Sequence, residues 1–137
     1  MPSLAHELHV LVALMDRAAD GLLARHGVGL SYRRFVVLLH VSEADGPTQR
    51  DLAERLGASE GATSRMVAGL VRDGLVDAAR GPGNSRELRL TPLGGERLAT
   101  AGAVLGDRFD VLVRGQGVDP TDLTTTVRRL AAALREG

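Results

Sequence analysis

The side chains of this chain that could carry out chemistry are few. Cysteine is absent, which excludes disulfides, thiolate metal sites and a cysteine nucleophile. No nucleophile–base pair or metal-ligand motif is formed by the four histidines, which are His6, His9, His26 and His40. Only His6 and His9, three residues apart on one helix face, could share a metal ion. The sequence therefore predicts a protein that is not an enzyme and uses no cofactor, with metal-responsive binding left as an alternative.

Arginine supplies all 17 basic residues, and lysine is absent. The guanidinium group suits the recognition of phosphate and guanine, because its planar fork donates two parallel hydrogen bonds. The net charge is zero, and residues 47–91 hold seven arginines against six acidic residues. A nucleic-acid-binding surface therefore requires the arginines to gather on one face after folding. With only three aromatic residues for base stacking, double-stranded DNA is the expected nucleic-acid partner.

Several helices are expected to position these arginines. Apolar residues recur every three or four positions in residues 4–25, which predicts a helix that ends near Gly27. Ser31 is a candidate N-cap for a second helix, which the segment 44–47 breaks.

Two short helices joined by a tight turn follow in the middle of the chain. Thr48 and Asp51 have the spacing of a capping box, and Gly57 ends the helix that they open. Ser59 is the candidate N-cap of the next helix, which stops at the segment 73–74. This pair has the layout of a helix-turn-helix.

The last part of the sequence predicts a hairpin and two further helices. Residues 75–80 and 87–91 are candidate strands around the loop 81–85. Residues 92–114 are expected to form one long helix, because Leu98, Leu105 and Leu112 repeat every seven residues. Asp119 is the N-cap of the final helix, with Pro120 at its first position. No apolar run approaches the ~20 residues that span a bilayer, and we expect a cytoplasmic protein without a membrane partner.

The order of these elements indicates a mainly α fold with a small β-hairpin wing, a winged helix-turn-helix. Within it, the stretch from Thr48 to Thr91 resembles the MarR family of transcription regulators. The motifs that carry the resemblance lie at residues 49–56, 62–67, 74–76, 84–86 and 90–94. Two positions depart from the family pattern, both in the wing. Asn84 replaces the usual Asp, and Ala78 stands where an Arg is common, which puts the geometry of the wing in doubt.

The resemblance implies a particular organisation and set of partners. Residues 1–137 would form a single MarR-like domain, with a winged lobe at 30–91 and dimerisation helices at 1–26 and 92–137. A homodimer would bind an inverted-repeat operator on double-stranded DNA, most simply as a repressor. Family members often respond to a small-molecule effector. Tyr32, His9 and Arg33 lie near the expected effector site, although a core or surface role is the simpler interpretation of each.

The resemblance also implies which residues contact DNA. The helix after Ser59 would enter the major groove, and Arg65 is the candidate for a bidentate contact to guanine, with a phosphate contact or an ion pair as its alternative. Arg86 would reach into the minor groove. The full set of candidates is Arg50, Ser59, Gly61, Thr63, Ser64, Arg65, Arg72, Asn84 and Arg86.

One rival interpretation is open at this point. A neutral net charge and an altered wing are also compatible with a winged-helix scaffold that binds proteins instead of DNA. Salt separates the two, because binding to DNA weakens steeply with salt and binding through an apolar interface does not.

Overall fold

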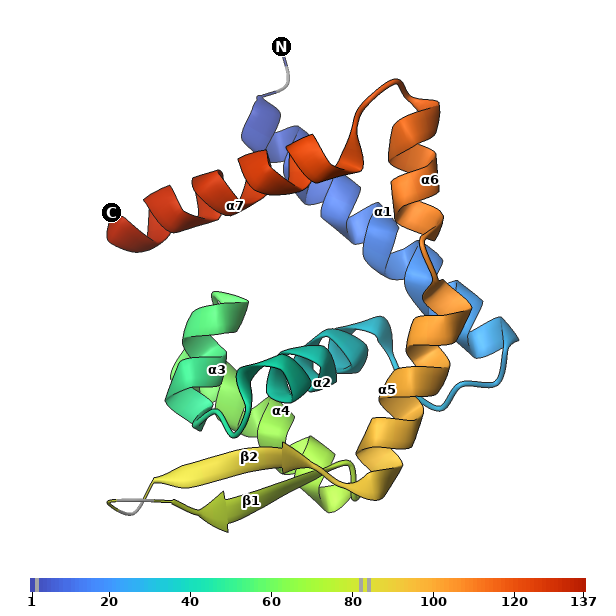
Figure 1. Ribbon diagram of the computed structural model, residues 1–137. Helices are drawn as coiled ribbons and strands as arrows, with labels where there is room; N and C mark the ends of the chain where they lie inside the picture. The colour runs from blue at the N-terminus through green and yellow to red at the C-terminus, as the bar shows by residue number, and fades with distance from the viewer. Residues whose placement is uncertain (2, 82, 84) are drawn as a thin grey trace. The chain divides into compact units, whose positions relative to one another are not determined.

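The computed structural model describes residues 1, 3–81, 83 and 85–137, which fall into two compact units, Met1–Leu105 and Gly106–Gly137. Figure 1 shows both as helical, with one two-stranded hairpin in the larger unit. The larger unit holds α1 (Leu4–Arg25), α2 (Tyr32–Ala44), α3 (Gln49–Leu56), α4 (Glu60–Arg72), β1 (Val76–Arg80), β2 (Arg86–Leu90) and α5 (Pro92–Leu105). The smaller unit holds α6 (Arg108–Gly115) and α7 (Pro120–Glu136).

Polar caps fix where these helices begin, as the sequence predicted. Thr48 and Asp51 form the reciprocal capping box of α3, in which each side chain accepts a backbone N–H. The left-handed Gly57 ends α3, and its φ of 64° is a conformation that suits glycine. Side-chain N-caps are also present at Ser31 for α2, Ser59 for α4 and Asp119 for α7. The helix-turn-helix is therefore set by local sequence signals.

A single apolar core holds the larger unit together. Leu38, Leu52, Leu70 and Leu88 are completely buried and come from α2, α3, α4 and β2. Ala101 adds α5 to the same cluster. Since burial of one such side chain contributes roughly 1.5–3 kcal/mol, this core fixes α4 against the rest of the lobe.

The hairpin is antiparallel, with Val76 opposite Leu90, Ala78 opposite Leu88 and Arg80 opposite Arg86. Side chains alternate between faces, so Leu88 enters the core while the neighbouring strand residues stay at the surface. The Leu88 N–H also donates to the Pro47 carbonyl at 2.8 Å, which fastens β2 to the loop before α3.

A compact joint links the end of α4 to the start of α5. The Thr91 hydroxyl donates to the Gly74 carbonyl at 2.6 Å and accepts from the Gly94 N–H at 3.0 Å. Gly94 packs so closely here that a Cβ on it would clash with the Leu75 carbonyl oxygen. The motif at residues 90–94 thus has a structural reason, because only glycine fits at its last position.

The prediction of a single long helix at residues 92–114 is wrong. α5 ends at Leu105, and α6 begins at Arg108, because Gly106 adopts a left-handed conformation with φ of 53°. The seven-residue leucine repeat does not form one seam, since Leu98 and Leu105 pack against the core of the larger unit. Leu112 lies on α6 and is 56% exposed.

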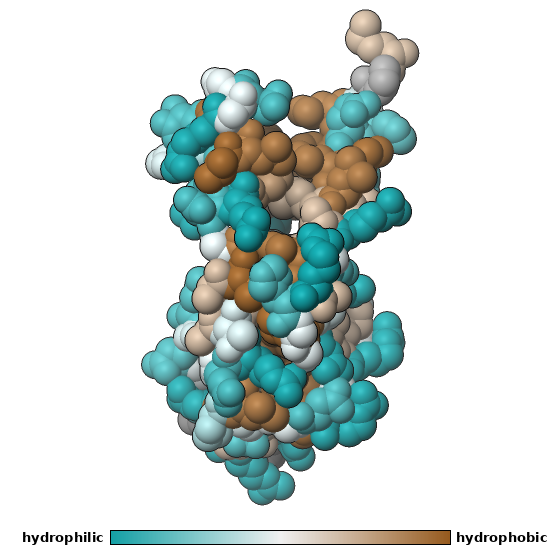
Figure 2. All heavy atoms as spheres, turned by 90° about the vertical axis from the view of Figure 1, so that its right-hand side faces the viewer, coloured by the Kyte–Doolittle hydropathy of each residue, from teal (hydrophilic) through white to brown (hydrophobic). Residues whose placement is uncertain are grey.

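Large apolar side chains are exposed on α1, α6 and α7. On α1 they include Leu4, Leu8, Val12 and Leu14. Figure 2 shows apolar side chains at the surface close to the N-terminus of the chain. In the smaller unit, Leu123, Val127, Leu130 and Leu134 recur along α7 at helical spacing and are all exposed. Exposed apolar stripes of this kind are typical of protein–protein interfaces.

The mainly α fold with a hairpin wing is confirmed. Within the described residues, no helix is both long enough and apolar enough to cross a membrane. The division into a lobe at 30–91 and flanking dimerisation helices remains a prediction. The hairpin strands lie within one residue of the expected ranges.

Candidate nucleic-acid interface

The second helix of the helix-turn-helix, α4, offers one face to solvent. Its buried positions are Thr63, Val67 and Leu70. The exposed positions are Glu60, Gly61, Ser64, Arg65, Ala68, Val71 and Arg72. The exposed side of α4 therefore carries mainly small and polar side chains together with two arginines, a composition that suits contact with base edges and phosphates.

Thr63 corrects the sequence-based list of contacts. It was expected at the surface, but its side chain is 2% exposed and its hydroxyl donates to the Ser59 carbonyl at 2.9 Å. The helix is rotated relative to the expected pattern, so that Thr63 faces inward while Ala62 is only partly buried. Thr63 is therefore a structural residue of α4, and it cannot reach DNA without local unfolding.

Arg65 lies on the exposed face of α4. Among the described residues, no acidic side chain lies within ion-pair distance of it, so the ion-pair alternative finds no partner. Its Nη1 atom lies 3.7 Å from the position that a Cβ on Gly61 would take. The guanidinium therefore lies along the helix over a residue without a side chain and keeps its donors for a ligand.

The neighbouring candidates have different surroundings. Ser64 is exposed. The Ser59 hydroxyl oxygen accepts from the Ala62 N–H at 3.1 Å, so its oxygen serves as the N-cap and its O–H remains able to donate. Contacts of Ser59, Gly61 and Ser64 with DNA remain predictions.

Two further arginines of the helix-turn-helix are at the surface. Arg50 is exposed in the first turn of α3. Arg72, in the last turn of α4, has its Nε 3.3 Å from the Asp73 carboxylate, and its side chain is 74% exposed. Both are placed where phosphate contacts are sterically open, and both remain predicted contacts.

In the wing, Arg86 begins β2 and faces its direct cross-strand partner Arg80. Both are exposed, and within the described part of the chain neither has an acidic partner. Like charges directly opposite each other destabilise a strand pair unless an anion lies nearby. Arg80 was not among the sequence-based candidates, because register across a hairpin is visible only after folding.

Three other positions complete the wing. Asn84 lies outside the residues that the structure describes. Ala78 pairs with Leu88 and is partly buried against the core. Arg89 is held at the base of the wing by Asp45 at 2.8 Å and by Glu87 at 3.4 Å. These carboxylates raise the pKa of Arg89, Asp45 having the larger effect, so Arg89 acts as a structural anchor for β2.

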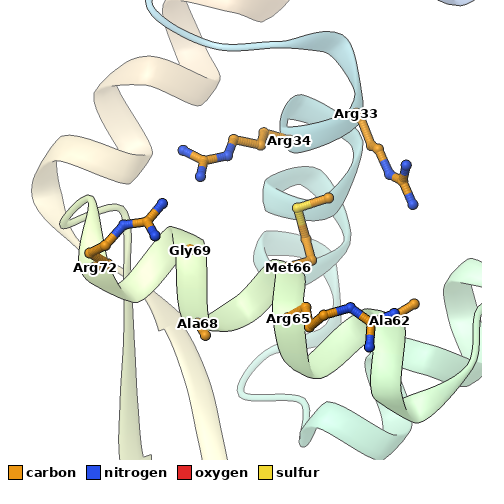
Figure 3. Close-up of a pocket in the computed structure, with 8 residues that line it drawn as sticks. All are labelled: Arg33, Arg34, Ala62, Arg65, Met66, Ala68, Gly69 and Arg72. Atoms are coloured by element: carbon orange, nitrogen blue, oxygen red, sulfur yellow. The ribbon is translucent and has the colours of Figure 1, made fainter.

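The N-terminal turn of α2 adds two arginines that sequence reasoning did not connect with α4. Figure 3 shows Arg33 and Arg34 on α2 opposite Arg65 and Arg72 on α4. Arg34 donates to Asp73, the C-cap of α4, at 2.7 Å. Hydrogen bonds from Arg34 and then from Arg72 lower the pKa of Asp73. The sequence shows that α2 carries charged residues, but it does not show the ion pair of Arg34, because its partner Asp73 lies 39 positions away.

The residues considered for an effector or a metal are dispersed. Tyr32 stacks on Phe35, with ring centroids 5.9 Å apart, and packs against the core. Burial, followed by the charge of Asp16, raises the pKa of Tyr32. His9 is exposed on α1. No group of three or more His, Asp or Glu side chains suited to a metal ion occurs among the residues described.

Several solved protein structures have a fold similar to that of this chain. MOSR of M. tuberculosis in complex with DNA has a TM-score of 0.83 at 21% identity, with 98% of each chain covered. MepR of S. aureus in complex with DNA has a TM-score of 0.76 at 18% identity, covering 98% of this chain and 96% of that chain. A MarR family transcriptional regulator from Silicibacter pomeroyi has a TM-score of 0.75 at 25% identity, covering 98% and 88%. No curated protein matches significantly by sequence.

The fold and the exposed face of α4 define a winged helix-turn-helix protein. The family model that matches residues 28–87 is that of the MarR family. This part of the chain is therefore similar to the MarR family of winged-helix regulators, and the fold agrees over 98% of the chain with MOSR and with the Silicibacter pomeroyi MarR family regulator.

Proposed function

We propose that this protein is a transcription regulator that binds double-stranded DNA sequence-specifically as a homodimer. The observation that carries the proposal is Arg65, exposed at the centre of α4 and without an acidic partner among the described side chains. The core fixes the opposite face of α4, so the guanidinium is presented on a rigid helix. The DNA complexes of MepR and MOSR, which share the fold, support the same function.

The homodimer is supported by the apolar residues of α1 and α7, which are exposed within this chain. Two-fold symmetry would present two copies of α4 to half-sites about one helical turn apart, which makes an inverted repeat the expected operator. A dimer held on such a site would repress transcription by occluding it, and the protein would act in the cytoplasm, without catalysis. Release by a small-molecule effector is part of the proposal and is supported by the family resemblance.

The first test is selection of bound duplexes from a random DNA pool by the purified protein at two salt concentrations. We expect an enriched inverted repeat and binding that weakens as salt rises. No enrichment at low salt would contradict DNA recognition and would favour the protein-binding scaffold.

The second test changes one side chain of α4. Arg65→Ala should reduce discrimination between the selected operator and a mismatched duplex by about 1–3 kcal/mol, the usual contribution of a bidentate base contact. Arg25→Ala, which removes the same charge at the end of α1, is the matched control and should keep full discrimination. Unchanged discrimination in Arg65→Ala would exclude its assignment to base recognition and would leave it as a phosphate contact at most.

A further inference from the structure

A depression of about 700 Å³ lies between α2 and α4 and contains four guanidinium groups. In Figure 3, Arg34 and Arg72 extend toward each other across it, while Arg33 and Arg65 lie at its other end, with Met66 between the two pairs. Among the described residues, the lining consists of Arg33, Arg34, Ala62, Arg65, Met66, Ala68, Gly69 and Arg72.

The charge of this depression is not balanced by the protein. Asp73 is paired with Arg34 at 2.7 Å and with Arg72 at 3.3 Å. Within the described residues, Arg33 and Arg65 have no acidic side chain within ion-pair distance. Four positive groups therefore share one carboxylate, an arrangement that repels itself unless an anion is bound.

Gly69 allows the guanidinium groups to approach the α4 backbone. A Cβ on Gly69 would lie 3.0 Å from Nη2 of Arg34 and 3.7 Å from Nη2 of Arg72. Arg34 of α2 thus brings positive charge close to the α4 backbone at Gly69, where no side chain of α4 stands in the way. Arg34 is held by Asp73 with its side chain 26% exposed, whereas Arg33 is exposed and ready to meet a ligand.

We propose that Arg33, at the edge of this arginine cluster, binds a phosphate group of the DNA backbone and so makes α2 a second DNA-contacting element, while Arg65 keeps its contact with the bases. This inference rests on the proposed function. A small organic ligand is normally enclosed over most of its surface by apolar and aromatic side chains. This depression is open, and Met66 is the one large apolar side chain among the described residues that line it, so it fits one oxyanion at the edge of a larger molecule.

Arg65 and Arg72 of α4 line the same depression as Arg33. A phosphate bound at Arg33 would therefore lie next to the helix that would enter the major groove. A contact to phosphate positions the protein and carries no sequence information. Arg33 should therefore contribute equally to binding of every duplex, whereas Arg65 should contribute more to the operator.

The test compares the salt dependence of DNA binding for the wild type, Arg33→Ala, Arg33→Lys and the control Arg25→Ala. Removal of Arg33 should reduce the slope of log K against log salt by roughly 0.9 for each phosphate that is no longer neutralised, hence about twice that in a dimer. Affinity for the operator and for a scrambled duplex should fall by the same factor. Arg33→Lys should restore most of the slope, and Arg25→Ala should leave it unchanged. Circular dichroism and the Tm verify that each variant is folded.

A second arm separates the DNA backbone from free phosphate. The Tm of the wild type and of Arg33→Ala is measured without DNA in sodium phosphate and in sodium chloride of equal ionic strength. Equal Tm values in the two salts, together with the reduced slope, support a site that takes phosphate from DNA. Protection of the wild type alone by free phosphate, with an unchanged slope, overturns the proposal in favour of a free-anion site.

The remaining outcomes distinguish the two proposals from each other. If the wild type selects an operator and Arg33→Ala keeps its affinity and slope, the α2 contact is overturned while the proposed function stands. If the wild type enriches no duplex even at low salt, the proposed function fails and this inference fails with it.

Discussion

The winged lobe and α7 use apolar residues in opposite ways. In the lobe, residues from α2, α3, α4, the hairpin and α5 all contribute to one buried cluster. In α7, Pro120 is the buried residue, while the stripe from Leu123 to Leu134 stays exposed. The lobe buries its apolar residues in one core together with Leu23 of α1, whereas α7 leaves an apolar stripe exposed, which we propose pairs with a second copy. Stability and recognition should therefore respond to different substitutions.

The largest expected effect is on the α7 stripe. The double variant Val127→Glu, Leu130→Glu places charges in the proposed dimer interface and should convert a dimer to a monomer. Binding to an inverted repeat should weaken about 100-fold, because a monomer contacts one half-site only and the second contact is no longer linked to the first. Thr125→Glu, on the opposite face of α7, is the control. Light scattering reads the mass, and a dimer that survives the double substitution would contradict an interface on α7.

The joint between α4 and α5 should show the largest loss of lobe stability from a single methyl group. Gly94→Ala drives a Cβ against the Leu75 carbonyl, a contact with backbone that cannot move aside, and should lower the free energy of unfolding by roughly 3 kcal/mol. Gly95→Ala is the matched control, because its Cβ would meet no atom within 4 Å, and should raise stability by up to about 1 kcal/mol. Equal denaturation midpoints for both variants would contradict the close approach.

The wing should respond more weakly, and with opposite signs for stability and binding. Arg80→Ala removes the repulsion across from Arg86 and should stabilise the hairpin by about 0.5 kcal/mol or less. If Arg80 and Arg86 contact DNA, Arg80→Ala should also lower the affinity for DNA and the slope of log K against log salt, as Arg86→Ala should. Arg89→Ala is the comparison, because it removes an arginine already paired with Asp45. Higher stability of Arg80→Ala with unchanged affinity for DNA would contradict a role of the wing in DNA binding.

The smallest effect is the pH dependence of the tie between α2 and α4. Arg34 lowers the pKa of Asp73 in the folded state, so this carboxylate stabilises the fold above its unfolded pKa of about 3.9. That contribution is lost as the pH falls through the lower, folded pKa. The difference in unfolding free energy between the wild type and Asp73→Asn should therefore be present at pH 6 and vanish at the acidic end. A difference independent of pH would exclude the ion pair as its cause.

Local signals made much of this fold predictable from sequence. Ser31, Thr48 with Asp51, Ser59 and Asp119 each cap a helix in the structure as their spacing indicated. Such caps act within three residues, so they can be recognised without knowledge of the tertiary fold. The position of the helix-turn-helix follows from the caps at Thr48 and Ser59, whereas the wing is indicated by two short candidate strands around the loop 81–85.

The errors arose where tertiary context decided. Gly106 lies inside the leucine repeat, and since isolated glycines are tolerated in helices, the sequence predicts a helix that continues through it. Thr63 was placed outside, because apolar periodicity favoured Ala62 as the inward residue, and a buried hydroxyl satisfied by the Ser59 carbonyl leaves no trace in that pattern. The arginines of α2 and Arg80 join the candidate interface only through contacts between distant segments, which one sequence cannot reveal.

The joint at Thr91 also determines how motion can reach α4. The residues that end α4 and those that begin α5 are bonded backbone to side chain and packed without room for a methyl group. Because these contacts join the segment after α4 to the first turn of α5, we expect a tilt of α5 to move α4 with it. In a dimer, a few degrees at α5 would change the distance between the two copies of α4, and with it the spacing of half-sites that the protein can accept.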